Sequence, residues 1–437
     1  MRLPARFTRA IAAVALLGCS MVARAQAPTP IAITAARLIV GDGSVIEHPV
    51  VIVVGDRITA VGAAGKVTIP AGARTIDLGA RTILPGLIDC HTHITSIDND
   101  GGDMSVLKET GANAAIYGVI NAKKTLDAGF TTIRDVGASN GADFAVRDEI
   151  NRGLIPGPRI YAAGAALGIL GGHADVNGYS PLVSIPGTGA IVTGTDEVRR
   201  QVRWNVKYGA DLIKIVATGG ILSSGDAAQA SQFSDEELRA AVDEATRLGR
   251  KVAAHAHGAK GIVAATNAGV ASIEHGSLID DAGIAAMKAH GTYLVPTLII
   301  LEEIISDGVK NGTPAYSIAK AKAIEPERRV RLRKAYQAGV KFAFGTDATG
   351  SIHGRNAQEF KLMIDQLGAT PMAAILTATS GAADLIGISD QVGTVTAGKW
   401  ADIIAVEGDP LTDVTRLEHV SFVMRGGAVV KQAEPNR

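Results

Sequence analysis

Between residues 82 and 385, short apolar runs rich in β-branched residues alternate with longer segments whose apolar residues recur every three or four positions. The short runs have the length of strands, and the longer segments have the period of amphipathic helices. One helix start is marked by Ser234 and Glu237, which have the spacing of a capping box. Eight candidate strands lie within residues 82–93, 131–137, 159–164, 211–217, 251–258, 271–276, 292–297 and 341–347. Strands and helices alternating in this way predict an α/β fold, a (β/α)8 TIM barrel.

The two ends of the chain have a different pattern. Residues 31–81 contain apolar runs broken by Gly-Asp turn signals, and the stretch from about residue 393 repeats this style. We therefore expect a small composite β-sandwich domain formed by residues 26–81 and 386–437, beside a barrel of residues 82–385. A doubly wound open sheet is the alternative fold, but no Gly-x-Gly-x-x-Gly motif follows the first barrel strand.

The first 25 residues resemble a targeting segment. Basic residues precede an apolar run over 10–17, and Ala23-Arg24-Ala25 fits a small-x-small cleavage site. This pattern predicts a signal peptide cleaved near Ala25 and an exported protein, periplasmic or secreted. The alternative is a lipoprotein signal, with lipidation at Cys19. The run is shorter than the ~20 residues of a spanning helix, and no other segment is long and apolar enough, so no membrane span is expected.

The charge and aromatic content argue against a nucleic-acid partner. Lys and Arg together number 43, Asp and Glu also number 43, and aromatic residues make up 4% of the chain. Nucleic-acid binding needs a basic face, or an aromatic platform on which bases stack. We therefore expect a small-molecule substrate.

Polar side chains gather at the ends of the predicted strands, where barrel enzymes place their reactive groups. His91 and His93 end the first strand, and His255 and His257 end the fifth. Residues two apart point to the same side of a strand, so each pair forms half of a metal site. A lone histidine there is usually a packed or surface residue, but six of the ten histidines lie at or after such ends. The candidate metal ligands are His91, His93, Lys214, His255, His275 and Asp347.

The motifs around these residues resemble those of the amidohydrolase superfamily. They are LPGLIDCHTH, DLIKI, AAHAHG, SIEHG and FGTDA, in the family's order. The flanking GDRITAVG and VGTVTAGKWADIIAV resemble its composite β domain, so the resemblance covers nearly the whole mature chain. Within the superfamily, the chain is most similar to the branch of Xaa-Pro dipeptidases, imidazolonepropionase-like proteins and ochratoxin A-degrading amidohydrolases.

The resemblance implies two divalent metal ions, with zinc expected. It assigns His91, His93 and Asp347 to one ion and His255 and His275 to the other. Lys214 would bridge both ions as a carbamate (N6-carboxylysine). An ammonium has no lone pair for a cation, whereas a buried lysine loses its proton readily. Asp347 would also be catalytic, taking a proton from the attacking water and giving it to the leaving nitrogen.

The implied reaction is hydrolysis of the amide bond of N-acyl amino acids or dipeptides, with release of the C-terminal amino acid. Conversion of ochratoxin A to ochratoxin alpha and phenylalanine is such a reaction. A cyclic-amide hydrolase or deaminase of the same superfamily, and a non-catalytic barrel used for assembly, are the alternatives. Lys214 favours the two-metal hydrolase, since a deaminase of this superfamily normally has a glutamate there. A homo-oligomer is expected by analogy with relatives.

Four further residues are predicted to contact the substrate. His173 follows two glycines in the loop after the third strand, and we expect it to contact the substrate carbonyl as a catalytic residue. His257 would either line the pocket or support a metal ligand from behind. His353 and Arg355 follow the eighth strand, and the guanidinium offers a bidentate fork for a substrate carboxylate. Alternatively, Arg355 caps the next helix or lies in solvent.

Overall fold

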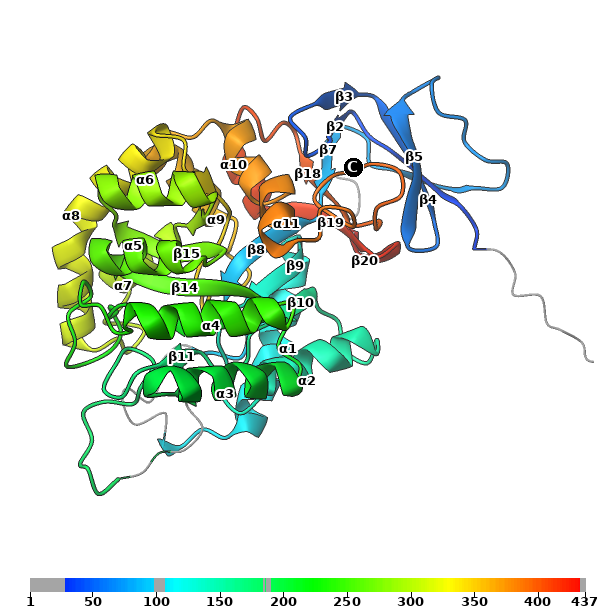
Figure 1. Ribbon diagram of the computed structural model, residues 1–437. Helices are drawn as coiled ribbons and strands as arrows, with labels where there is room; N and C mark the ends of the chain where they lie inside the picture. The colour runs from blue at the N-terminus through cyan, green and yellow to red at the C-terminus, as the bar shows by residue number, and fades with distance from the viewer. Residues whose placement is uncertain (1–27, 98–106, 184, 186–189, 433–437) are drawn as a thin grey trace, which may run out of the picture.

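The computed structural model describes residues 28–97, 107–183, 185 and 190–432. The predicted signal peptide, including Ala25 and Cys19, lies outside these residues. The described chain forms a barrel wrapped by helices and a β-rich domain attached to one side of it (Figure 1). In this part of the chain, no helix has both the length and the apolar character that crossing a membrane requires.

All eight predicted barrel strands are present, and neighbouring strands are parallel. Two backbone hydrogen bonds close the ring between its two sheets. The N–H of Asp211 donates to Ala162 at 2.8 Å, and the N–H of Cys90 donates to Phe344 at 2.9 Å. The (β/α)8 prediction is therefore confirmed. The strands are β8 (Leu87–Thr92), β9 (Phe130–Asp135), β10 (Arg159–Ala162), β13 (Leu212–Val216), β14 (Lys251–Gly258), β15 (Ser272–Leu278), β16 (Tyr293–Val295) and β17 (Lys341–Phe342), with the short pair β11 (Leu167–Gly168) and β12 (Ala190–Ile191) beside β13.

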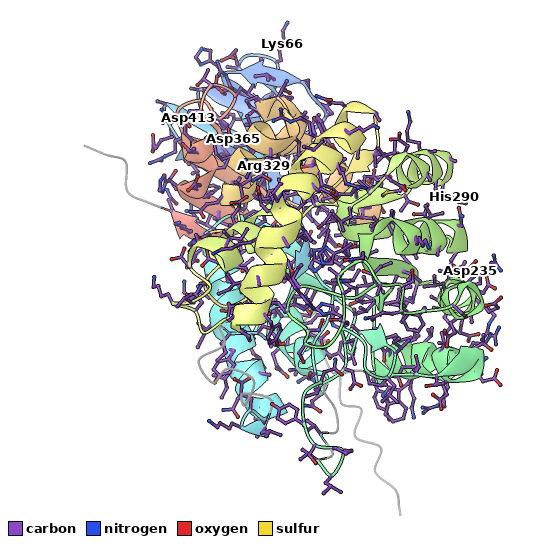
Figure 2. All side chains as sticks on the ribbon, turned by 90° about the vertical axis from the view of Figure 1, so that its left-hand side faces the viewer. Lys66, Asp235, His290, Arg329, Asp365 and Asp413 are labelled. Carbon is purple, nitrogen blue, oxygen red and sulfur yellow. The ribbon has the colours of Figure 1, made fainter. Side chains whose placement is uncertain are left out.

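Helices cover the outside of the barrel, and α3 to α6 lie side by side, with α3 and α4 packed on β13 and α5 on β14 and β15 (Figure 1). Asp235, His290 and Arg329 mark the exposed outer faces of α4, α6 and α8 (Figure 2). The capping box starts α4 as predicted, because the N–H of Glu237 donates to the Ser234 hydroxyl at 3.2 Å. The helices are α1 (Gly111–Asp127), α2 (Ala142–Asn151), α3 (Gly194–Lys207), α4 (Asp235–Arg247), α5 (Ala259–Ala268), α6 (Asp281–His290), α7 (Leu298–Ser306), α8 (Ala315–Gln337), α9 (Gln358–Leu362), η2 (Met363–Leu367), α10 (Pro371–Thr377), α11 (Ser380–Ile386) and η3 (Val414–Glu418).

The β domain is a sandwich of two sheets, ordered β5-β4-β1-β6 and β20-β19-β18-β7-β2-β3. In the larger sheet, β18 runs antiparallel to β7 and pairs Ala405 with Ile83, so both ends of the chain build it. Ile33, Ile403 and Phe422 are buried between the sheets. This composition from both ends confirms the predicted second domain. The strands are β1 (Ile31–Thr34), β2 (Arg37–Ile39), β3 (Val45–Glu47), β4 (Pro49–Val54), β5 (Arg57–Ala63), β6 (Arg74–Asp77), β7 (Arg81–Pro85), β18 (Ile403–Glu407), β19 (Val420–Arg425) and β20 (Ala428–Gln432).

A single glycine separates the two domains at their first junction. The sequence pattern predicted one strand within residues 82–93, but the structure divides it at Gly86 into β7 and β8. A Cβ on Gly86 would lie 2.1 Å from the Oγ1 of Thr131, so only glycine fits this close approach. The sheet of the β domain thus reaches Pro85, beyond the predicted limit at residue 81. The other domain limits stay predictions.

Candidate metal centre and active site

A cavity of about 330 Å³ lies at the C-terminal ends of the barrel strands. Its volume is at the lower end of the range for small-molecule sites. The structure brings all six predicted metal ligands into its wall, together with His173 and His257. The predicted ligands come from four strands, β8, β13, β14 and β15, and from the segment after β17, as expected for a barrel enzyme.

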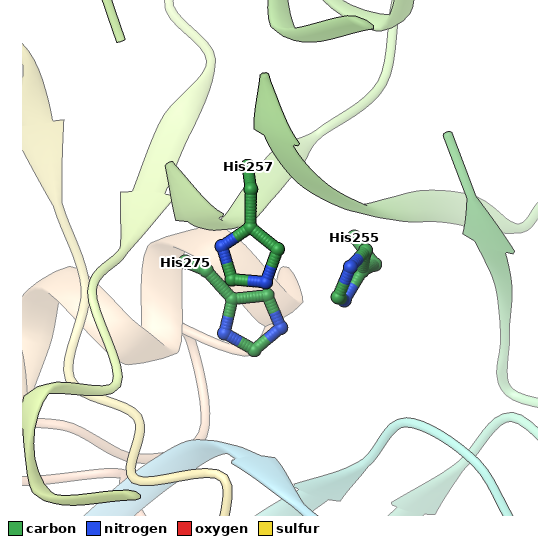
Figure 3. Close-up of side chains that lie close together, drawn as sticks. All are labelled: His255, His257 and His275. Atoms are coloured by element: carbon green, nitrogen blue, oxygen red, sulfur yellow. The ribbon is translucent and has the colours of Figure 1, made fainter. Parts of the chain in front are cut away.

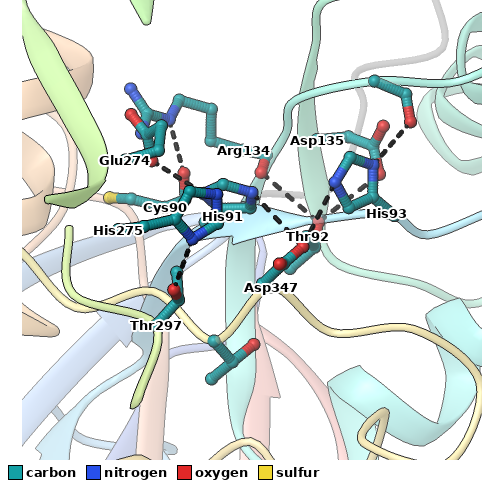
Figure 4. Close-up of polar contacts among 12 residues, drawn as sticks. Cys90, His91, Thr92, His93, Arg134, Asp135, Glu274, His275, Thr297 and Asp347 are labelled. Carbon is teal, nitrogen blue, oxygen red and sulfur yellow. Dashed lines mark hydrogen bonds and ion pairs between the residues drawn. The ribbon is translucent and has the colours of Figure 1, made fainter. Parts of the chain in front are cut away.

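His91, His93 and Asp347 converge on one point (Figure 4). The Oδ1 of Asp347 lies 3.3 Å from the Nε2 of His91 and 3.2 Å from the Nε2 of His93. Ligands at the corners of a tetrahedron with bonds of ~2.05 Å are roughly 3.3 Å apart. The Nδ1 of His93 donates to the Gly137 carbonyl at 2.8 Å, which leaves Nε2 free as a ligand. The spacing and this tautomer fit a bound metal ion.

A second group of donors lies next to the first. His255, His257 and His275 each offer a ring nitrogen, and these atoms lie within 4.8 Å of one another (Figure 3). The Nε2 of His255 donates to the Gly219 carbonyl at 3.1 Å, so its Nδ1 is available. His275 also belongs to a donor group with His91 and Asp347, which makes the two groups adjacent.

The protonation states of His255, His275 and Asp347 suit metal binding. Burial, reinforced by neighbouring imidazoles, holds the pKa values of His255 and His275 well below their usual range, so both are neutral at pH 7. Burial alone would raise the pKa of Asp347, but His91 and His93 outweigh it and hold that pKa well below its usual range. Neutral imidazoles and an ionised carboxylate are the forms that bind a divalent cation.

A model of the amidohydrolase family matches residues 82–430. The chain belongs to this family. It is 34% identical over 421 residues to an ochratoxinase of Aspergillus niger, a match covering 91% of this chain and 86% of that protein. A solved structure of a Xaa-Pro dipeptidase with bound methionine in the active site is 38% identical, with a TM-score of 0.85, covering 92% of this chain and 100% of that one.

An imidazolonepropionase of Cutibacterium acnes is 26% identical over 379 residues, covering 83% of this chain and 84% of that protein. The predicted superfamily and branch are thereby confirmed. The chain is an amidohydrolase, an enzyme that hydrolyses amide bonds.

Glu274 and Arg134 support the amidohydrolase site, and sequence reasoning missed both. The buried Glu274 carboxylate accepts hydrogen bonds from the Nη2 of Arg134 and from the Nδ1 of His91, each at 2.8 Å (Figure 4). Ligand histidines commonly donate their second nitrogen to a carboxylate, which fixes the tautomer and ring orientation. The signal in the sequence was the glutamate directly before His275, inside the SIEHG motif.

The backbone is strained at the centre of the site. Five non-glycine residues of the described chain have a positive φ, and three of them are His275 at 69°, Thr297 at 47° and Asp347 at 56°. The left-handed conformation is a genuine outlier for a β-branched residue such as Thr297. Its hydroxyl lies 2.8 Å from the Nδ1 of His275. Each strained residue costs about 1–3 kcal/mol, and such residues cluster at functional sites of enzymes.

His173 lies in the cavity as predicted, and its contacts define its tautomer. Its Nδ1 is 2.8 Å from the hydroxyl of Ser223, which itself donates to the Asp226 carboxylate at 2.6 Å. The Ser223 oxygen must therefore accept from Nδ1–H, and the neutral ring keeps Nε2 as an acceptor. Burial lowers the pKa of His173 to about 4. This tautomer favours contact with a substrate N–H over the predicted contact with the carbonyl.

Gly220 makes room for His173, since a Cβ there would lie 2.2 Å from the imidazole Cε1. His257 also lines the cavity, with its ring stacked on His275 at a centroid distance of 4.8 Å. Its predicted contact with the substrate stays a prediction.

Two predicted substrate contacts lie elsewhere. Neither His353 nor Arg355 is among the described residues that line the cavity. His353 is buried, with its Nδ1 2.9 Å from the hydroxyl of Thr125 on α1. Arg355 donates to the Glu303 carboxylate at 2.7 Å. Both side chains have partners within the fold, and their predicted contacts with the substrate stay predictions.

Proposed function

We propose that this amidohydrolase uses two divalent metal ions, with zinc expected, to release the C-terminal amino acid from N-acyl amino acids or dipeptides. The observation that carries the proposal is the pair of adjacent donor groups, with the buried Lys214 in the same wall. The similarity to an ochratoxinase and a Xaa-Pro dipeptidase supports the type of bond. Ochratoxin A, an amide of phenylalanine, is therefore a test substrate.

Lys214 is proposed to carry a carbamate that holds both ions. Its side chain is 3% exposed, and burial lowers its pKa to about 8. The neutral amine is therefore accessible near pH 7, and only this form attacks carbon dioxide. In that step an N–C bond forms, an amine proton passes to solvent, and the product is an anion able to bind two cations.

The remaining steps are assigned to side chains of the chain itself. When bound, the metal ions supply Lewis-acid activation of the substrate carbonyl and of the attacking water. Asp347 takes a proton from that water and delivers it to the leaving nitrogen as the C–N bond breaks. His173 accepts a hydrogen bond from a substrate N–H through Nε2 and so orients the scissile amide.

The cavity wall away from the histidines is apolar. Ile300, Leu301 and Ile304 of α7 line it, together with Ile221 and Leu222 from the segment after β13. Apolar walls with a few polar groups are typical of sites for small ligands. This wall supports a substrate with a hydrophobic acyl group or side chain, such as phenylalanine.

The test is a screen of zinc-loaded protein against N-acyl amino acids, dipeptides and ochratoxin A, with products identified by mass. We expect a free C-terminal amino acid, including phenylalanine from ochratoxin A or N-acyl-phenylalanine. Ammonia, or ring opening without a free amino acid, would instead identify a deaminase or cyclic-amide hydrolase. Protein that binds no zinc and stays inactive after reconstitution would contradict both assignments.

A further inference from the structure

Arg328 is a buried cation in the wall of the catalytic cavity. It lies on α8, and its side chain is among the largest fully buried ones in the described chain, with 1% exposed. Apart from Lys214, it is the one Lys or Arg among the described residues that line the cavity. No part of the proposed hydrolysis uses it.

The contacts of Arg328 compensate its positive charge only in part. Its Nη2 lies 3.3 Å from the Oε1 of Glu302 and 3.2 Å from the Oε1 of Gln366, and its Nε has no partner. Charge-assisted hydrogen bonds are usually about 2.7–2.9 Å long. The Glu302 carboxylate is also shared, because the Nε2 of Gln366 donates to it at 2.7 Å. A buried guanidinium in this state needs a further anion.

Arg134 gives the contrast within the same barrel. It is buried to a similar degree, with 4% exposed, but all three of its nitrogens have partners. They donate to the Cys90 carbonyl at 2.5 Å, the Ser272 hydroxyl at 2.9 Å and the Glu274 carboxylate at 2.8 Å. The fold thus gives every guanidinium nitrogen of Arg134 a hydrogen-bond partner, whereas the guanidinium of Arg328 at the cavity keeps a nitrogen without one.

Arg328 lines the same cavity as the predicted ligands His91 and His275. The apolar residues Ile300 and Ile304 line the same cavity. A small substrate can therefore reach the metal-binding side chains with one end and the guanidinium with another.

We propose that Arg328 binds the α-carboxylate of the substrate and so directs hydrolysis to the amide bond of a C-terminal residue. The inference rests on the proposed function, because it names the group that distinguishes an N-acyl amino acid from an ordinary amide. It replaces Arg355, the arginine expected from the sequence, whose carboxylate partner Glu303 is already in place. A planar guanidinium presents the paired donors that a carboxylate accepts.

The test compares N-benzoyl-L-phenylalanine with its carboxamide on wild-type protein, Arg328→Gln and Arg329→Gln, all loaded with zinc. Arg329 is the matched control, because it is the next residue on α8 and also lies near Glu302, at 3.5 Å, but is exposed, pairs with Glu325 and does not line the cavity. Binding is measured by calorimetry and cleavage of the benzoyl–nitrogen bond by mass. We expect the wild type to bind the acid on the order of 10²-fold more tightly than the carboxamide.

The affinities of Arg328→Gln for the acid and for the carboxamide should differ by no more than about threefold. The loss should appear mainly as a higher KM for the acid. Arg329→Gln should keep the wild-type preference for the acid. A wild-type circular dichroism spectrum and zinc content would show that Arg328→Gln is folded. If it does not fold, Arg328→Lys replaces it, and loss of the fork should lower the preference at least about tenfold.

Three outcomes would overturn the inference: equal binding of acid and carboxamide by the wild type, an unchanged preference in Arg328→Gln, or an unchanged preference in Arg328→Lys where that variant is used. Binding that favours the acid and disappears in Arg328→Gln, without any cleavage by the wild type, would support the carboxylate site. That result would contradict the proposed hydrolysis, so the two failures can be told apart.

Discussion

Replacing Glu274 with glutamine should destabilise the protein and weaken its metal binding together. The change keeps the shape of the side chain but removes its charge. Arg134 would lose the carboxylate 2.8 Å from its Nη2 and keep only the neutral Cys90 carbonyl and Ser272 hydroxyl. Breaking a buried ion pair by removing one partner costs about 3–5 kcal/mol, because the other charge stays buried.

The pKa of Glu274 gives a magnitude of the same order. Burial alone would raise it, but the charge of Arg134 and the hydrogen bond from His91 lower it from 4.5 to about 2. At about 1.36 kcal/mol per pKa unit, the ionised carboxylate contributes roughly 3 kcal/mol to the free energy of unfolding. A carboxyl with a lowered folded pKa stabilises the fold above its unfolded pKa. The wild type should therefore exceed Glu274→Gln in free energy of unfolding by the whole amount above pH ~5. This difference should shrink as the pH falls from ~4.5 toward ~2.

The assay is urea unfolding of the metal-free proteins at pH 7 and at pH 3.5, followed by circular dichroism. Asp365→Asn is the control. Asp365 lies at the surface (Figure 2) and forms an exposed helical pair with Lys361 worth less than about 0.5 kcal/mol. Zinc titration of Glu274→Gln should show an affinity about 10–100-fold lower, because His91 loses the carboxylate that orients it. A loss of unfolding free energy below about 1 kcal/mol at pH 7, unchanged by acid, would refute the reasoning.

Further predictions concern turnover, metal content, pocket shape and processing. Asp347→Asn should keep most of its zinc but turn over on the order of 10²–10⁴-fold more slowly, because an amide cannot relay the proton; full activity would exclude that role. Lys214→Met should bind roughly one zinc ion per chain where the wild type binds two, as measured by elemental analysis. Gly220→Ala should displace His173 and raise KM, since its Cβ would lie 2.2 Å from the ring, and an unchanged KM would contradict the packing argument. The exported protein should begin at Gln26 by intact mass, whereas a lipid on Cys19 would show the alternative signal.

The barrel and its strand-end residues could be predicted because five of the eight strands carry two signals of their own. A β-branched run predicts the strand, and the residues in it or directly after it predict the chemistry. The two-residue spacing of His91 and His93 placed both rings on one side, and their centroids are 5.5 Å apart. His255 and His257, at the same spacing, have centroids 4.7 Å apart. Such local rules need no knowledge of the rest of the fold.

The side chains that the sequence did not reveal depend on contacts across the fold. Arg328 lies in a helix segment crowded with cations, a pattern typical of a solvated face. Which arginine points inward depends on how the helix is rotated against α7, with which it packs. The positive φ of Thr297 leaves no trace in its residue type, because a β-branched residue ordinarily avoids that conformation. The partners of Arg355 are likewise set by the course of the loop after Asp347.

The pairing of β7 with β18 bears on how the molecule assembles during synthesis. Ile83 and Ala405 are 322 positions apart, and closing so long a loop costs roughly 5 kcal/mol of chain entropy. Most barrel strands pair with neighbours that follow within a few dozen residues, so the barrel has contacts to form while the chain is still growing. Until β18 has been made, β7 lacks its antiparallel neighbour, and the buried side chains of Ile83 and Leu84 have no finished core to enter. We expect pairing of the last strands to be the slow step of folding. The yield of active enzyme should then depend on an export pathway or chaperone that protects the unpaired edge of β7 until β18 is made.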